Sequence, residues 1–118
     1  NAQHFIGMHK DEIKQVMNDS HKTFKLNTTS VNPHYNYLKY EDIINEITIL
    51  YFLSDDDKCT LVRKMYDYVN INDVERELNE KYSKVGKNKW EYRYLLQKYS
   101  VELTEGEWFF TVTIKKKE

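Results

Sequence analysis

The strongest constraint on the fold is an alternation of apolar and polar side chains near the C-terminus. On both sides of Glu105-Gly106, every second residue is apolar or aromatic: Tyr99, Val101, Leu103, Trp108, Phe110, Val112 and Ile114. The intervening positions are polar except Phe109. Successive side chains of a strand point to opposite faces, so this pattern predicts two strands that share one buried face. A two-residue turn at Glu105-Gly106 would pair Leu103 with Trp108 and give Gly106 a positive φ.

Segments rich in β-branched and aromatic residues predict further antiparallel strands at 35–41, 47–53, 59–66 and 90–96, and a short one near 24–26. Pairing Leu53 with Cys59 across the acidic turn 54–58 places one set of side chains on a single face: Ile47, Ile49, Tyr51, Leu53, Cys59, Leu61 and Met65, with Arg63 discordant. Because a slip of one residue would move a whole strand to the other face, this register decides which side chains are buried.

Two amphipathic helices are predicted at 9–20 and 73–84 from apolar residues at helical spacing. His9 and Glu12 stand at the two positions of a capping box, although Ser or Thr is the usual cap. We therefore expect an α+β fold, with an antiparallel sheet of five or six strands and two short helices on one face. The predicted core comprises Ile13, Val16, Val74, Leu78, Trp90, Val101, Leu103, Trp108, Phe110 and Val112.

The order of the predicted elements repeats along the chain. One helix and three strands are followed by another helix and three strands, and the halves align at an offset that carries position 40 onto 90. Tyr40-Glu41 then matches Trp90-Glu91, and Leu53-Ser54-Asp55 matches Leu103-Thr104-Glu105. This indicates either a tandem αβββ repeat or the coincidence of two hairpins with acidic turns.

Length and composition favour one domain without a covalent framework. The chain has 118 residues, a formal net charge of −1 and a single cysteine. A chain of this length can form one hydrophobic core. The balanced charge does not favour nucleic acid or an anionic membrane as a partner, and one cysteine cannot form an internal disulfide. Asn1-Ala2 resembles the remnant of a protease site from an expression vector, which leaves residues 3–118 as a single α+β domain.

The start at Gln3, without a preceding Met, predicts an exported, periplasmic or cell-envelope protein from which a signal peptide was removed. A fragment of a longer cytosolic chain would start in the same way. The sequence contains no apolar run near the roughly 20 residues that a transmembrane helix needs, so no transmembrane segment is expected.

The first helix carries a resemblance to known exported proteins. The segment Phe5-Ile6-Gly7-Met8-His9-Lys10-Asp11-Glu12-Ile13 resembles the Gly-Met-Ser/Thr-x-x-Glu-Val opening of the beta-lactamase inhibitory proteins and of the small lipoprotein of the outer-membrane barrel-assembly machinery. Both are exported α+β domains that bind proteins, so the resemblance implies an exported binding module. It covers this opening alone, with His9 in place of the hydroxyl residue, and no functional residue is carried over. The chain is also similar to small uncharacterised secreted proteins of Gram-negative bacteria.

No set of residues in the sequence predicts catalysis, a cofactor or a metal site. The four histidines lack the i, i+4 spacing that brings two imidazoles to one helix face. Cys59 falls on the predicted apolar face, and the acidic turn lacks the alternation of a calcium-binding loop. We therefore expect a non-enzymatic protein- or ligand-binding module. An enzyme would need residues from distant segments, such as His34 and carboxylates, to converge.

A nucleic-acid-binding module is a second alternative, because basic residues interleave with aromatic ones between 81 and 98. Against it, Trp90, Tyr92 and Tyr94 share one strand face and are expected to pack under the second helix.

The candidate site is the sheet face away from the helices. Two helices are too narrow to cover a sheet of this width, so one face stays open. The predicted registers place Leu50, Phe52, Val62 and Phe109 there among threonines and Lys64. We expect these four residues to contact an envelope protein or a second copy of the chain, with Phe52 and Phe109 as aromatic anchors. The other possibility is a partly wetted surface with no partner, since scattered exposed apolar side chains are common.

Overall fold

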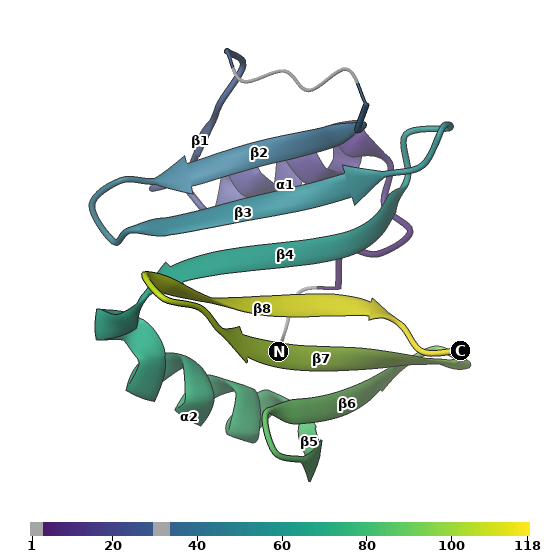
Figure 1. Ribbon diagram of the computed structural model, residues 1–118. Coiled ribbons are helices and arrows are strands. Elements are labelled where there is room, and N and C mark those ends of the chain that lie inside the picture. The colour runs from purple at the N-terminus through teal and green to yellow at the C-terminus, as the bar shows by residue number, and fades with distance from the viewer. Residues whose placement is uncertain (1–3, 30–33) are drawn as a thin grey trace.

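The computed structural model describes residues 4–29 and 34–118 and contains one antiparallel sheet with two α-helices on one of its faces (Figure 1). The sheet has eight strands in the order β1-β2-β3-β4-β8-β7-β6-β5. The elements are α1 (Lys10–Ser20), β1 (Lys25–Leu26), β2 (Tyr37–Asp42), β3 (Ile47–Leu53), β4 (Cys59–Asp67), the 3-10 turn η1 (Tyr68–Asn70), α2 (Ile71–Lys81), β5 (Ser83–Gly86), β6 (Lys89–Tyr94), β7 (Gln97–Glu105) and β8 (Phe109–Lys116). None of the helices in the described ranges is long and apolar enough to cross a bilayer.

The broad α+β class is confirmed, but the expected five or six strands are wrong. The short strand expected near 24–26 joins the sheet as β1 at one edge, and β5, which was not expected, forms the other edge. The apolar spacing predicts a second helix that extends to residue 84, whereas α2 ends at Lys81 and Tyr82 is already extended. Val85 completes the apparent helical stripe, yet it is exposed on β5, which pairs with β6 across a turn where Asn88 has a positive φ.

Two halves of similar element order meet at the centre of the sheet. Each half is a helix followed by four strands, and β4 of the first half pairs with β8 of the second. At this junction Arg63 lies opposite Thr113, Leu61 opposite Lys115 and Met65 opposite Thr111. The central pair is Arg63 and Thr113. These two positions differ by the same offset as positions 40 and 90, which match in the sequence. The expected αβββ order is therefore αββββ in the structure.

A register irregularity at the start of β4 reverses the side-chain assignment of that strand. Leu53 does pair with Cys59, but Phe52 pairs with Leu61, because the ladder shifts between Phe52 and Leu53. An extra residue at such a bulge exchanges the two faces. Val62, Lys64 and Tyr66 consequently face the helices. The assignments of Val62 and Lys64 to the open face are therefore wrong, since only 2% of Val62 is exposed and Lys64 lies near α2.

The β7–β8 hairpin keeps its predicted faces but not its predicted register. Leu103 pairs with Val112, and Glu105 pairs with Phe110, where a two-residue turn would have paired Leu103 with Trp108. A shift by an even number of residues preserves the faces, so Phe110 is buried as expected. Trp108 falls in the longer turn and is 79% exposed, which makes its core assignment wrong.

Gly106 is required in this turn for space and not for a positive φ. Its N–H donates to the carbonyl oxygen of Phe109 at 2.9 Å. A Cβ at position 106 would lie 2.7 Å from the same oxygen, so the backbone closes too tightly for any other residue. The predicted positive φ is not among those the described residues adopt.

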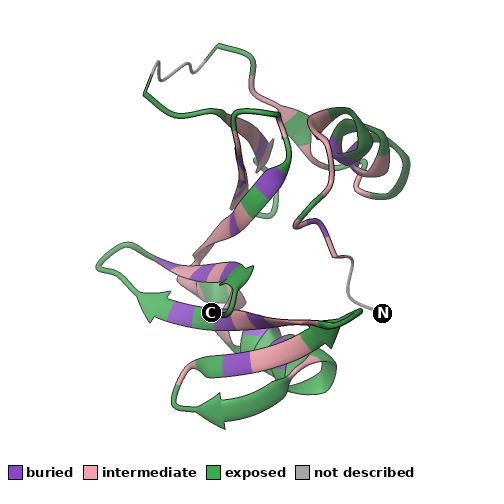
Figure 2. Ribbon diagram, turned by 90° about the vertical axis from the view of Figure 1, so that its right-hand side faces the viewer, coloured by how far each residue is buried: buried purple, intermediate pink, exposed green. Residues whose placement is uncertain are grey.

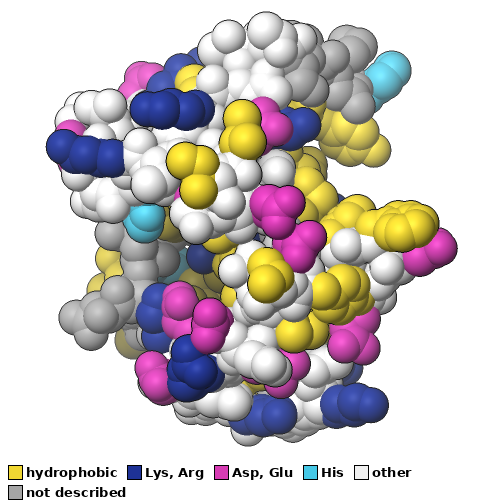
Figure 3. All heavy atoms as spheres, turned by 90° about the vertical axis from the view of Figure 1, so that its left-hand side faces the viewer, with side chains coloured by type: hydrophobic (Ala, Val, Ile, Leu, Met, Phe, Trp, Pro, Cys, Tyr) yellow, Lys and Arg dark blue, Asp and Glu magenta, His cyan; other side chains and the backbone are white. Residues whose placement is uncertain are grey.

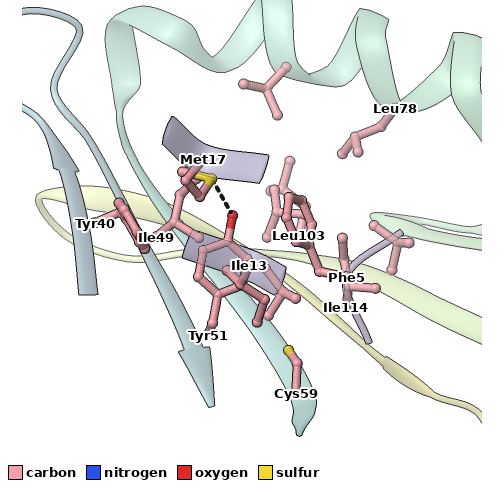
Figure 4. Packing of buried hydrophobic residues seen from close by; sticks show 14 of the residues in the cluster. Phe5, Ile13, Met17, Tyr40, Ile49, Tyr51, Cys59, Leu78, Leu103 and Ile114 are labelled. Carbon is pink, nitrogen blue, oxygen red and sulfur yellow. Dashed lines mark hydrogen bonds between the residues drawn. The ribbon is translucent and has the colours of Figure 1, made fainter. Parts of the chain in front are cut away.

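The core lies between the helices and the sheet, and buried residues alternate with exposed ones along the strands (Figure 2). Under α1, Ile13 and Met17 are buried against Tyr51, whose hydroxyl donates to the Met17 sulfur at 3.1 Å (Figure 4). Under α2, the buried Trp90 donates its indole N–H to Asn79 Oδ1 at 2.9 Å. The core assignments confirmed are Ile13, Val74, Leu78, Trp90, Val101, Leu103, Phe110 and Val112, whereas Val16 is partly buried.

The start of α1 is fixed as its sequence predicts. The His9 side chain accepts from the Asp11 backbone N–H at 3.2 Å, and Glu12 accepts from the His9 N–H at 3.1 Å, which completes a capping box. Just before it, Gly7 adopts φ 94° and donates to the Cys59 carbonyl oxygen at 2.8 Å. This contact fastens the N-terminal segment to β4.

Candidate functional site

The structure separates the four residues of the predicted contact site. Leu50 and Phe52 lie on the open face, Val62 is in the core, and Phe109 lies at one end of the sheet, where β8 begins. Around Phe52 the open face holds a small cluster. The Arg63 guanidinium lies 5.6 Å from the centre of the Phe52 ring, and the Tyr37 ring centre lies at 6.0 Å.

Among the residues that the structure describes, the largest group of exposed apolar side chains is instead at the end of the sheet where Phe109 lies. We call it the apolar tip, and its members are Ile43, Ile44, Val69, Trp108 and Phe109. They belong to the β2–β3 turn, to η1, to the β7–β8 turn and to the first residue of β8, which lie along this end of the sheet. Ile44 is 91% exposed and Trp108 is 79% exposed. Figure 3 views the molecule from this side and shows hydrophobic side chains gathered on the surface.

Hydrogen bonds between the three loops hold the apolar tip together. Asp67 N–H donates to the Glu46 carbonyl oxygen at 3.3 Å, and Asn70 Nδ2 donates to the Asn45 carbonyl oxygen at 3.2 Å. These contacts join η1 to the β2–β3 turn. The Tyr68 hydroxyl donates to the Gly106 carbonyl oxygen and thereby joins η1 to the β7–β8 turn. The exposed side chains therefore stand on linked backbone.

The two isoleucines are positioned by a buried carboxylate. Asp42 is buried, and its oxygens accept from the Asn45 N–H at 3.0 Å, from Asn45 Nδ2 at 2.7 Å and from the Thr23 hydroxyl at 2.8 Å. The Asn45 hydrogen bonds are the main reason that the pKa of Asp42 is lowered. With its Asp and Asn ends bonded to each other, the turn projects Ile43 and Ile44 outward into solvent.

The charge of the apolar tip is entirely acidic. Segments 42–46, 67–70 and 105–109 contain no Lys, Arg or His, and they contribute exposed carboxylates at Glu46, Glu105 and Glu107. Acidic side chains are visible among the hydrophobic ones in Figure 3. The opposite end of β6 and β7 differs, because its exposed Leu95 and Leu96 stand between Arg93 and Lys98.

No constellation of reactive groups accompanies this surface. The described residues contain no group of His, Cys, Asp and Glu side chains that could hold a metal ion. Burial raises the pKa of the Cys59 thiol to about 11, so the thiol is protonated at neutral pH. Burial also lowers the pKa of His4, which lies on the Tyr94 ring with its Nδ1 2.8 Å from the Tyr92 hydroxyl.

The basic and aromatic segment 81–98 offers little surface for stacking bases. Trp90 is 1% exposed under α2, and Tyr92 is stacked between Tyr82 and Tyr99, with ring centres 4.9 and 5.2 Å away. Tyr94 is exposed, but His4 lies on its ring at 4.0 Å.

Of the apolar tip, the sequence pattern identifies Phe109 alone. Ile43-Ile44 was a usable signal, because two large apolar residues sat between Asp and Asn in a segment that had to be a turn. Trp108 was not identified as exposed, because the predicted two-residue turn placed it in a strand. Val69 carried no signal by itself, since its exposure depends on where β4 ends. No family model matches the chain, and comparisons with curated proteins and with solved structures give no match.

Proposed function

We propose that the chain is a non-enzymatic binding module that contacts a protein partner through the apolar tip. The observation that carries this proposal is the exposure of Trp108 and Ile44 on loops that are hydrogen-bonded to one another. Contiguous exposed apolar side chains mark interaction surfaces, and Trp is enriched among the residues that dominate binding energy. The resemblance of the first helix to exported binding proteins supports the cell envelope as its setting.

Rigid support of the apolar tip favours binding. Association loses free energy when flexible loops must be ordered, and loops already joined by hydrogen bonds avoid much of that loss. Asp67 adds to this order, because its carboxylate accepts from the Val69 N–H at 2.8 Å and fixes the turn that presents Val69. The side chains are thus presented before a partner arrives.

Charge defines the chemistry of the partner. Glu46, Glu105 and Glu107 stand among the apolar side chains without a basic residue in the same loops. We infer that the partner is a protein with an apolar pocket bordered by Lys or Arg, since such a surface complements both properties. An anionic lipid surface fits poorly, because the same carboxylates would be repelled by it.

A photo-crosslinking experiment tests the proposal. A benzoylphenylalanine in place of Trp108 is compared with one in place of Leu96, which is equally apolar and 98% exposed at the other end of the sheet. Expressed in cells of the source organism, the probe at 108 should crosslink one dominant protein, and the probe at 96 should not. Adding Glu105→Lys and Glu107→Lys should abolish that crosslink.

Three outcomes would overturn the proposal. Equal crosslinking from positions 108 and 96 would mean nonspecific contact. Crosslinking that survives both charge reversals would show that the partner lacks the basic border inferred for it. A crosslink only to a second copy of the chain would replace the proposed partner by self-association.

The open face is a second candidate contact surface. Its supporting observation is the cluster in which Arg63 lies over the Phe52 ring beside the exposed Tyr35. This surface is cationic where the apolar tip is acidic, so the two would not bind the same partner. Sedimentation of the Phe52→Ser and Trp108→Ser variants distinguishes the two surfaces. Only the substitution in the surface that makes the contact should cause the complex to dissociate.

A further inference from the structure

A groove on the helix side of the sheet, beside α2 and the end of α1, is a concave surface separate from the apolar tip. Its volume is about 450 Å³, and its floor is formed by the central strands β3, β4 and β8. The side of α2 contributes Val74 and Leu78, the α1 side contributes Phe24 beyond the end of that helix, and β8 contributes Val112 and Ile114. Small-molecule sites in proteins have this size and are lined mainly by apolar side chains with a few polar groups.

One polar group in the floor of the groove is the Lys64 ammonium. Lys64 projects from β4 on the helix face and is largely buried, which lowers the pKa of its amine. No hydrogen bond or ion pair joins its ammonium to any of the residues described. Glu77 is the carboxylate that acts on it electrostatically, but Glu77 is paired with Lys81 at 2.6 Å. A buried cation with no direct partner is destabilising, so its position needs a reason.

The other half of the sheet shows that the fold does not need a lysine there. Corresponding positions of the two halves differ by the same offset as Arg63 and Thr113, the pair at the centre of the β4–β8 ladder. Under this relation Val62 corresponds to Val112, and both are buried. Lys64 corresponds to Ile114, which is a buried apolar residue of the same groove. An aliphatic side chain therefore meets the structural requirement, and the cation at 64 is an addition.

Two hydroxyl groups in the lining of the groove add hydrogen-bond donors. Tyr66 and Tyr82 both line the groove, and burial raises the pKa of each phenol, so both keep their protons at neutral pH. No hydrogen bond of either hydroxyl is found within the described residues. An ammonium and two phenol O–H groups can all donate to one oxyanion.

We propose that the groove binds a monoanionic amphiphile, with the anionic head on Lys64 and the apolar chain along Leu78, Val112 and Ile114. The head group neutralises the Lys64 ammonium, and the alkyl chain lies against the apolar lining of the groove. The inference does not depend on the proposed contact at the apolar tip, because it rests on different residues. A carboxylate with a medium-length alkyl chain has this chemistry.

The probes are three ligands with the same ten-carbon chain: decanoate, decanol and decyltrimethylammonium. Binding is measured by isothermal titration calorimetry below the concentration at which each ligand aggregates. Backbone amide shifts of β4, β8 and α2 show whether the groove is the site. Decanoate should bind at least about tenfold more tightly than decanol, as expected when a charged group gains hydrogen bonds. Each methylene removed from decanoate should weaken binding by about fourfold.

Variants identify the group that selects the anion. Lys64→Ile copies the residue of the other half, so it should fold, retain decanol and lose the preference for decanoate. Lys39→Ile, on the open face, is the matched control and should bind as the wild type does. Circular dichroism verifies the fold of each variant.

Three results would overturn the inference. Equal binding of all three ligands would show a groove that selects only apolar chains. Binding of none would mean that the groove takes no amphiphile. A preference for decanoate that persists in Lys64→Ile would move the anion to another cation. None of these results bears on crosslinking from position 108, so the two proposals fail separately.

Discussion

The two halves of the sheet share an architecture but differ at two corresponding places. The first half carries the polar turn 54–58 between β3 and β4, whereas the second half carries the turn with Trp108 between β7 and β8. In the first turn the Ser54 N–H donates to the Lys58 carbonyl oxygen at 2.8 Å, and Asp57 accepts from Asn36 at 2.8 Å. The interior of the sheet shows the reverse difference, with Lys64 in the first half and Ile114 in the second.

These differences separate what the fold requires from what it tolerates. A polar turn closes one hairpin, so the corresponding hairpin does not need exposed Trp and Phe. An isoleucine fills one interior position, so the corresponding position does not need a lysine. Where one half departs from ordinary burial rules and the other obeys them, the departure is a candidate for function.

The largest contrast is between the two tryptophans. Trp90→Ala should lower the free energy of unfolding by about 3–5 kcal/mol, because it removes a buried ring and leaves a cavity under α2. Its hydrogen bond to Asn79 would also be lost. Urea denaturation followed by circular dichroism measures the change. A loss below about 1 kcal/mol would show that α2 does not pack on β6 as described.

Exchanging the interior residues of the two halves should give effects of opposite sign. Ile114→Lys should destabilise the protein by about 2–4 kcal/mol, because it buries a second cation without a partner. Lys64→Ile should stabilise it by about 1–2 kcal/mol at neutral pH, because it removes the first. Thermal unfolding of both variants tests the pair. A destabilised Lys64→Ile protein would mean that the ammonium is satisfied in the native state.

The stability difference between the wild type and Lys64→Ile should depend on pH, because the pKa of Lys64 is lowered. Between its folded pKa and the ordinary value near 10.5, the unfolded chain binds a proton that the folded chain does not. Wild-type stability relative to Lys64→Ile should therefore rise as the pH increases toward about 10. Tyrosine ionisation affects both proteins and cancels in the comparison. A difference independent of pH would contradict the burial of the amine.

A smaller effect of pH on stability is expected from the histidines of the N-terminal part of the chain. Burial lowers the pKa of His4 and of His21, so both are neutral in the folded state at a pH where the unfolded chain takes up protons. Stability should be complete above about pH 6.5 and should decrease as the pH falls below it. His4→Gln should reduce this slope and leave the part due to His21. Urea titrations above about pH 5 avoid the carboxylates; an unchanged slope would show that His4 does not remain neutral.

The parts of the fold predicted from sequence were those set by local pattern. The alternation in β7 and β8 defined their faces, and the periodicity of Ile13 and Met17 located α1. The errors came from features that periodicity does not encode. A bulge reversed β4 and moved Val62 into the core, and a longer turn moved Trp108 out of it. β5 was missed because Tyr82 and Val85 continued the apolar spacing of α2.

The candidate site was predictable only in part, because it depends on which turns meet at one end of the sheet. Ile43, Val69 and Trp108 are far apart in sequence and come together through the strand order β2-β3-β4-β8-β7. That order requires the pairing of β4 with β8, which no local pattern indicates. Phe109 was identified because it interrupted an otherwise regular alternation.

The most direct test of the central claim is the free energy of unfolding of the double variant Ile44→Ser, Trp108→Ser. If the apolar tip serves a partner and not the fold, both side chains are dispensable for folding. The variant should match the wild type within about 0.5 kcal/mol per substitution, with the same dependence on urea. It should also lose the crosslinked partner, with the probe now placed at Val69. A loss of about 2 kcal/mol or more would show that Ile44 and Trp108 belong to the core and would contradict the account.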